Sequence, residues 1–240
     1  MTVEMAQAVP RSESVLQLRR ESTAQQVAGA LRELIVTGGL PAGAHLREAA
    51  LAQQLGVSRN TVREAVQILV SKGLVRREMH RGAYVAELTE DDVSDLFRVR
   101  RLVELTAVRE IAGSKQTGPL REALPVLAAA VESGDRYAIA EADLEFHRRL
   151  VALMDSERLG ALYDGVDAEM QLCLARATSA SVDPSAILKD HKAILAAIER
   201  ADADTAARRL ERHLDAGERL LIGVFKAPPM APSAEPNVEA

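Results

Sequence analysis

The chain has 240 residues, of which 48% are hydrophobic, 27% are charged and only 2% are aromatic. This balance is typical of a globular protein, and the few aromatic side chains favour a core of packed helices built from Leu, Ala, Val and Ile. The net charge is −5, which excludes a protein that coats nucleic acid along its whole surface. Residues 1–88 contain 11 Lys and Arg against 8 Asp and Glu, whereas the remainder contains 19 against 27. The first third of the chain is therefore able to bind phosphate groups.

Cysteine usage and hydropathy set the expected compartment. The single cysteine, Cys173, excludes a disulfide framework and a cysteine metal cluster, and we expect it to be a small buried apolar residue. The N-terminal sequence lacks the apolar core of a signal peptide, and no apolar run reaches the roughly 20 residues that span a membrane. We therefore expect a cytoplasmic protein.

The first third of the chain predicts a winged helix-turn-helix. Residues 1–20 are polar without a clear period, so we expect a flexible arm. Apolar spacing, caps and glycine or proline stops then predict three helices followed by two short strands, over 23–36, 47–55, 58–72, 74–77 and 83–86. We assign this winged helix-turn-helix to residues 21–87.

The rest of the chain predicts only helices. Thr89 precedes three acidic residues, which is typical of a capped helix start. Six helices are predicted, over 89–113, 119–132, 135–154, 156–178, 184–200 and 203–224. Four prolines in the tail indicate disorder over 225–240. The fold class is therefore mostly α, with the winged helix-turn-helix followed by an all-α bundle of six helices over residues 89–224.

The segment from Glu48 to Leu69 carries the pattern of a DNA-reading motif. Gly56 permits the positive φ of a tight turn, Val57 is the apolar plug of that turn, and Ser58 caps the next helix. Polar residues then face outward where helix-turn-helix proteins contact base edges and phosphates. The predicted DNA contacts are Arg47, Ser58, Arg59, Asn60, Thr61 and Arg63, with His80, Arg81 and Gly82 at the tip of the wing. The alternatives are a helical hairpin with solvated arginines, or a winged helix used only for protein contacts.

The run LREAALAQQLGVSRNTVREAVQILVSKGLVRREMHRGAYV resembles the N-terminal domain of the GntR family of regulators. The family's Val-Ser-Arg turn followed by Val-Arg-Glu-Ala is matched by residues 57–59 and 62–65. The family often has Thr-Pro where this chain has Asn60-Thr61, and some members have an arginine where this chain has Ala49, with Arg47 nearby. The resemblance implies a transcription regulator that binds double-stranded operator DNA.

Histidines in the second part of the chain indicate a candidate metal site. Asp143 and His147 are four residues apart, hence on one face of a helix, while His191 and His213 lie on later helices. Imidazoles with one carboxylate suit Zn, Ni, Mn or Fe. From spacing alone the three histidines need not converge, since most helical histidines are ordinary surface or core residues.

Residues 91–222 resemble the FCD ligand-binding domain of FadR-type GntR regulators, and six helices suggest the VanR-like subgroup. Arg100 and Glu104 match its opening Arg-x-x-x-Glu, Asp143 to His147 match its Asp-x-x-Phe-His, and the run DHKAILAAIERADADTAARRLERHL matches its closing pattern. The resemblance implies that Asp143, His147, His191 and His213 hold a divalent metal ion, and that a small organic or sugar acid binds beside it.

Arg100 is the candidate for the carboxylate of that acid, because a guanidinium offers two parallel donors. Its alternative role is an ion pair with Glu104. We further expect solvent-facing side chains at Arg148 and Arg149, and weaker candidates for the pocket wall at Arg176 and Thr178. Tyr137 and Tyr163 fit a core position as well as a pocket position.

The expected function is that of a homodimer, a repressor rather than an enzyme, in which the acid shifts helices and changes the separation of two DNA-reading helices. One alternative is a helical metalloenzyme, such as a hydrolase, for which Glu141, Glu145 and Asp190 lie near the ligands in sequence without a recognisable motif. Another is a metal ion that only holds the helices together.

Overall fold

The computed structural model describes residues 22–79, 81–114, 116–177 and 183–226. Three helices and an antiparallel pair of strands come first: α1 Thr23–Val36, α2 Glu48–Leu55, α3 Arg59–Ser71, β1 Val75–Glu78 and β2 Gly82–Val85. We call this part the winged-helix domain. All five predicted elements are present, and each strand is displaced by one residue from its predicted range.

Local sequence explains the boundaries of these helices. Ser22 and Gln25 form a reciprocal capping box at the start of α1. Gly56 ends α2 with a φ of 64°, a conformation that favours glycine, and Ser58 then caps α3. The buried stripe of α3, which includes Val62 and Val66, packs against α1 and the wing. The exposed face of α3 is thereby left for the polar residues at its N-terminal end.

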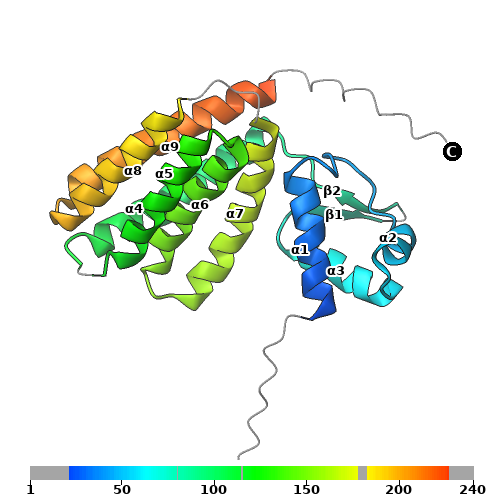
Figure 1. Cartoon of the computed structure of the whole chain (residues 1–240). Coiled ribbons are helices and arrows are strands. Elements are labelled where there is room, and N and C mark those ends of the chain that lie inside the picture. Colours follow the sequence, from blue (N-terminus) through cyan, green and yellow to red (C-terminus); the bar gives the residue numbers. More distant parts are fainter. Residues whose placement is uncertain (1–21, 80, 115, 178–182, 227–240) are drawn as a thin grey trace, which may run out of the picture.

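Six helices are described after residue 89: α4 Glu90–Ile111, α5 Gly118–Ser133, α6 Arg136–Ala152, α7 Glu157–Arg176, α8 Pro184–Glu199 and α9 Ala203–Lys226. We call them the helical domain. They form the bundle in Figure 1, in which α9 packs on α4 and α8, and α6 packs between α5 and α7. This agrees with the mostly α fold class and the six predicted helices.

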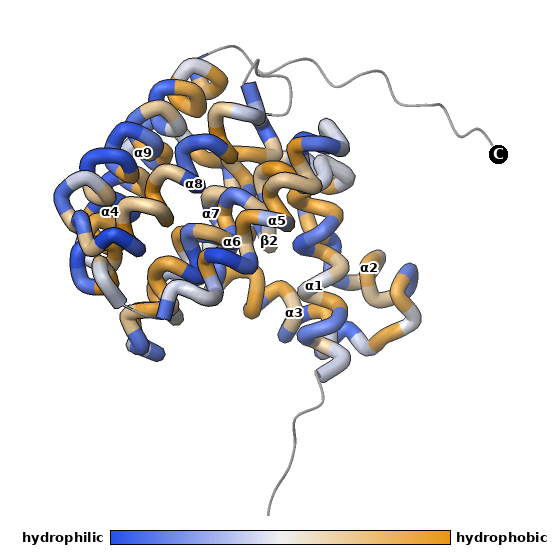
Figure 2. The backbone as a smooth tube through the Cα atoms, turned by 60° about the vertical axis from the view of Figure 1, so that its left-hand side comes forward, coloured by the Kyte–Doolittle hydropathy of each residue, from blue (hydrophilic) through white to orange (hydrophobic). Residues whose placement is uncertain are grey.

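The apolar core of the helical domain consists of one large cluster and a smaller one between α5 and α6. Hydrophobic and hydrophilic positions alternate along its helices (Figure 2), and the largest fully buried side chains include Phe97 and Phe146. Cys173 is buried, as expected, and burial raises the pKa of its thiol to about 12. None of the described helices combines the length and the apolar composition that crossing a membrane requires.

The two domains meet where α7 lies beside α1 (Figure 1). Ala168 of α7 belongs to the apolar core of the winged-helix domain, and Leu172 packs against that core. The Arg32 Nε of α1 donates a hydrogen bond to Gln171 Oε1 at 3.0 Å. Apolar and polar contacts therefore both join α1 to the helical domain.

Candidate metal centre and nucleic-acid interface

Four potential metal ligands converge from three helices. Asp143 and His147 lie one turn apart on α6, His191 lies on α8 and His213 on α9. One ligand atom from each lies within 4.8 Å of all the others. The two Nε2 atoms of His147 and His213 are 3.2 Å apart, and Asp143 Oδ1 is 3.3 Å from His191 Nε2. The fold thus brings these residues together, whereas sequence spacing alone did not decide whether the three histidines converge.

An oxygen atom lies behind each imidazole, and for His147 and His191 it is within hydrogen-bond distance. His147 Nδ1 is 2.6 Å from Glu104 Oε2, and His191 Nδ1 is 2.8 Å from the backbone oxygen of Ile187. Because a carbonyl oxygen only accepts, the proton of His191 is on Nδ1, and its Nε2 lone pair faces the centre. His213 Nδ1 lies 3.9 Å from Asp190 Oδ2. Such outer partners are typical of metal-ligating histidines.

Buried atoms without partners indicate that the centre fits a cation. Asp143 Oδ1 and His191 Nε2 are both buried and have no hydrogen-bond partner, which costs free energy unless something else satisfies them. Burial lowers the pKa of His191 to about 3, so its imidazole is neutral. Burial opposes ionisation of Asp143, but the three histidines outweigh it and its pKa lies below the usual value. Three imidazoles and one carboxylate suit a divalent transition metal.

Glu104 supports the centre from α4. Its side chain is completely buried, and its carboxylate accepts hydrogen bonds from Arg100 Nε at 2.7 Å and from the Tyr163 hydroxyl at 2.6 Å, in addition to its contact with His147. Burial alone would raise the pKa of Glu104, but Arg100 and His147 outweigh that effect, so its pKa lies far below the usual value. Glu104 is therefore an anion that fixes His147.

Arg100 forms the ion pair with Glu104 that was the alternative to carboxylate binding, and one of its donors is left unpaired. Its Nε forms the buried ion pair with Glu104, while its Nη2 is buried without a hydrogen-bond partner. Burial opposes its charge, but Glu104 outweighs that cost and the pKa of the guanidinium lies above its usual value. Arg100, Asp143 and His213 together line a cavity of about 360 Å³. One donor of the guanidinium thus remains available beside the metal centre.

The expectation of solvent-facing arginines on α6 is wrong. Arg148 is 25% exposed, and its guanidinium binds Glu141, Glu145 and Asp167. Arg149 binds Glu145 and donates a hydrogen bond to the backbone oxygen of Pro119. The physical reason is that α6 packs between α5 and α7, so the face turned away from the metal centre is partly covered by neighbouring helices.

The remaining candidates for the pocket wall have different surroundings. Tyr163 is a core residue that holds Glu104, whereas Tyr137 is 37% exposed and lines a second cavity. The Arg176 guanidinium lies 4.3 Å from the centre of the Phe225 ring and lines neither of these two cavities. Thr178 lies outside the described residues.

Sequence reasoning assigned no role at this centre to the residues behind the ligands. The sequence pattern indicates Glu104 only as part of the Arg-x-x-x-Glu pattern and as a partner of Arg100, yet it holds His147. Asp190, considered only for an enzyme, faces His213. A signal was present, because Asp190 directly precedes His191 and an acid four residues after Arg100 shares its helix face. Glu141 and Glu145 are engaged by Arg148.

The N-terminal end of α3 presents polar residues to solvent. Arg59, Asn60 and Arg63 are exposed, and Arg63 Nε lies 3.4 Å from Glu48 Oε2. The Ser58 hydroxyl accepts a hydrogen bond from the backbone of Thr61, so these two residues shape the cap of the helix. Arg47 is exposed at the start of α2. All of these residues therefore lie on the outer side of the helix-turn-helix.

The wing is a tight hairpin with a basic residue at its turn. Arg81 pairs with Glu78 at 2.6 Å, and the Tyr84 hydroxyl donates to the backbone oxygen of Arg81. Gly82 has a φ of 105°, and a Cβ there would lie 2.7 Å from His45 Nε2, so only glycine fits. His80 lies outside the described residues.

Comparisons with known proteins identify both domains. Residues 23–85 match the model of the bacterial regulatory proteins of the gntR family, and residues 95–216 match the FCD domain model. The "Probable D-xylose utilization operon transcriptional repressor" of Paenarthrobacter nicotinovorans is 32% identical over 83% of this chain and 88% of its own. The "Gluconate operon transcriptional repressor" of Bacillus licheniformis is 28% identical over 82% of this chain and 84% of its own.

Solved structures agree with these matches. The crystal structure of a GntR transcriptional regulator from Rhodococcus sp. RHA1 superimposes with a TM-score of 0.77 at 31% identity, covering 85% of this chain and 99% of that one. The family and the named relatives are transcriptional regulators that bind DNA, and not enzymes. This chain therefore belongs to the GntR family of DNA-binding transcriptional regulators, with the FCD domain of its FadR-type members.

Proposed function

We propose that this regulator is a homodimeric repressor whose affinity for operator DNA is set by a small carboxylate bound beside a divalent metal ion. The observation that carries the proposal is the convergence of Asp143, His147, His191 and His213. Two of these residues, Asp143 and His213, line a cavity that Arg100 also lines. A metal site without such a cavity would favour a purely structural ion. The cavity gives a ligand access to the centre.

Arg100 and the metal centre are the groups at this cavity that suit a carboxylate, and Asp183 and Asp190 line another part of it. The metal ion, when bound by the four ligands, would act as a Lewis acid toward one carboxylate oxygen of the effector. The Arg100 Nη2 has no hydrogen-bond partner and can donate to the second oxygen. Glu104 and Tyr163 hold this arrangement in place from behind, so the receptor site is preorganised.

A polar network gives the signal a path to the DNA-binding domain. The Arg32 guanidinium of α1 contacts Gln171, and its Nη2 lies 3.7 Å from Glu141 Oε2. Glu141 in turn binds Arg148. Glu141 and Arg148 lie on α6, within two residues of the ligands Asp143 and His147. A shift of α6 on acid binding would therefore act directly on α1.

On the DNA side, we infer contacts to base edges and phosphates from α3, with help from α2 and the wing. The residues are Arg47, Ser58, Arg59, Asn60, Thr61, Arg63, His80, Arg81 and Gly82. A two-fold operator needs two recognition helices at a fixed separation, and a movement of α1 within each protomer would change it. The relatives named as repressors support the sign of the regulation.

The test measures metal content and operator binding in one preparation. We expect about one divalent metal ion per chain, its loss in His147→Ala, and weaker binding to the upstream DNA of its own gene in the presence of an organic or sugar acid. An acid response that survives complete metal removal would contradict metal involvement and favour a structural ion. DNA binding that no acid changes would contradict the sensor function.

A further inference from the structure

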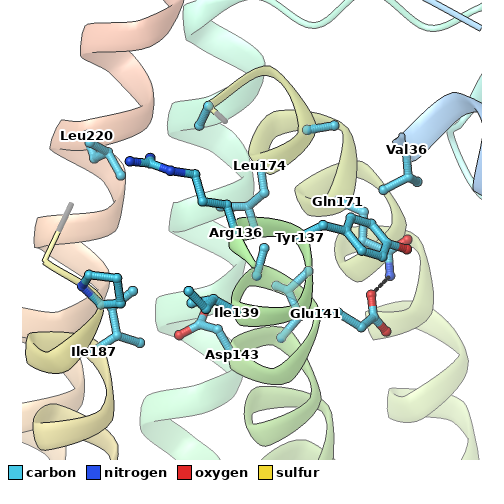
Figure 3. A pocket seen from close by; sticks show the side chains of 15 residues that line it. Val36, Arg136, Tyr137, Ile139, Glu141, Asp143, Gln171, Leu174, Ile187 and Leu220 are labelled. Carbon is cyan, nitrogen blue, oxygen red and sulfur yellow. Dashed lines mark hydrogen bonds between the residues drawn. The ribbon is translucent and has the colours of Figure 1, made fainter. Parts of the chain in front are cut away.

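A second cavity adjoins the one that Arg100 lines. It measures about 120 Å³, and its lining comes from α1, α6, α7, α8 and α9 (Figure 3). Asp143, Leu174, Ile187 and Leu220 line both cavities, so the two share a wall. A ligand anchored at Arg100 and the metal centre therefore has the second cavity next to it.

Apart from Asp143, which belongs to the candidate metal centre, the charged and amide side chains around the second cavity are already paired. Glu141 accepts hydrogen bonds from Arg148 and from Gln171, the latter drawn in Figure 3, and Gln171 Oε1 accepts one from Arg32. Arg136 also has an interaction partner. An occupant would thus find few groups with which to form hydrogen bonds.

The rest of the wall is apolar, with side chains that include Val36, Tyr137, Ile139, Leu144, Leu174 and Ile187. The Arg100 cavity has a similar character away from its charged side, where Phe97, Met170 and Leu214 line it. A sugar acid has a hydroxyl on nearly every carbon, and burying these groups against apolar walls without partners would weaken binding. A hydrocarbon chain or ring has no such cost.

We propose that the second cavity is a subsite for the apolar end of the effector, which is a carboxylic acid with an aliphatic or aromatic body and not a sugar acid. This inference rests on the proposed function, because it takes the carboxylate end to be held at Arg100. Val36 belongs to α1, so the apolar end would touch the winged-helix domain directly. The length of the acid would then determine how strongly the two domains are coupled.

The probes are a homologous series of linear acids, from butanoate through hexanoate to octanoate, with D-gluconate as the polar comparison. Binding to the full-length, metal-loaded protein is measured by calorimetry. Each methylene that becomes fully buried should tighten binding by roughly fourfold. Affinity should therefore rise along the series, and octanoate should bind more tightly than D-gluconate.

Two substitutions test whether the hydrocarbon chain of the acid occupies the second cavity. Ala175→Leu on α7 and Ala140→Leu on α6 each add bulk to a half-buried wall residue of the second cavity. Both should remove most of the gain from butanoate to octanoate. Ala161→Leu is the matched control, because Ala161 is exposed on the same helix as Ala175. The control should leave the whole series unchanged.

The outcomes separate the subsite from the function it rests on. A chain-length effect that both cavity variants abolish and the control retains would support the subsite. A chain-length effect that neither variant changes, or tight binding of D-gluconate with no binding of octanoate, would overturn it while the sensor function stands. If no acid binds and none alters DNA affinity, the sensor function fails and the subsite fails with it.

Discussion

The candidate DNA-reading end of α3 and the candidate metal centre of the helical domain arrange their polar side chains in opposite ways. On α3 the candidate contacts are near neighbours in sequence, on one helix, and largely exposed. At the metal centre the ligands come from three helices, and His147 and His191 are completely buried. A local motif can therefore be changed without disturbing the fold, whereas the convergent site and the fold of its domain depend on each other.

The largest effect should come from Glu104→Ala. This change removes a buried anion that binds Arg100, His147 and Tyr163, and leaves the Arg100 charge buried without its partner. Breaking such a pair costs about 3–5 kcal/mol of unfolding free energy, and losing an outer partner of a histidine ligand costs about 10–100-fold in metal affinity. Urea unfolding and metal titration measure the two effects.

Glu110→Ala is the control for that experiment, because Glu110 lies exposed on the same helix. It should change the unfolding free energy by less than about 0.5 kcal/mol. If Glu104→Ala were as harmless as this control, the support that Glu104 gives to the centre would be refuted.

Metal removal should have the next largest effect, and it should be confined to the helical domain. An ion that binds only the folded protein adds about 2.7 kcal/mol to the free energy of unfolding when its free concentration is 100 times the dissociation constant. Chelation should therefore lower the melting temperature, and re-addition of the ion should restore it. An unchanged melting temperature after verified removal would argue against the centre as a metal site.

Arg59→Ala should act on DNA binding alone. A lost contact to a base edge costs about 1–3 kcal/mol of binding free energy, while an exposed helix residue contributes little to stability. Fluorescence anisotropy with operator DNA measures the first quantity and urea unfolding the second. Equal operator affinity of the variant and the wild-type protein would remove Arg59 from the proposed interface.

Arg32→Ala should have the smallest effect on stability, since the Arg32 side chain is 32% exposed and its ion pair with Glu141 is long. We expect a loss below about 1 kcal/mol in unfolding free energy. The informative quantity is the change in operator affinity on adding acid, which should shrink although metal and acid still bind. A full response in the variant would exclude Arg32 from the coupling.

The same comparison explains what the sequence could predict. The elements of the winged-helix domain follow from local signals such as Ser22, Gly56 and Ser58, and they agree with the structure apart from a one-residue displacement of the strands. Helix boundaries in the second domain are predictable for the same reason, with Thr89 as an example. These signals act within a few residues of the chain.

For the candidate metal centre, the sequence pattern predicts the four residues that the structure brings together, but not the residues that support them. Spacing showed that Asp143 and His147 share a helix face, yet only tertiary packing brings His191 and His213 to them. Packing also explains the wrong expectation for Arg148, because no local pattern reveals that the outer face of α6 meets α7. The contact between Arg32 and Gln171 spans 139 positions and has no local signature.

The most direct test of the account is the dissociation constant for operator DNA, measured with metal-loaded and metal-free protein, each with and without a saturating carboxylic acid. The account predicts that the acid weakens operator binding of the metal-loaded protein and has little effect on the metal-free protein or on metal-loaded Arg100→Gln. An equal acid response in all three preparations would contradict the central claim that the acid acts through the metal centre and Arg100.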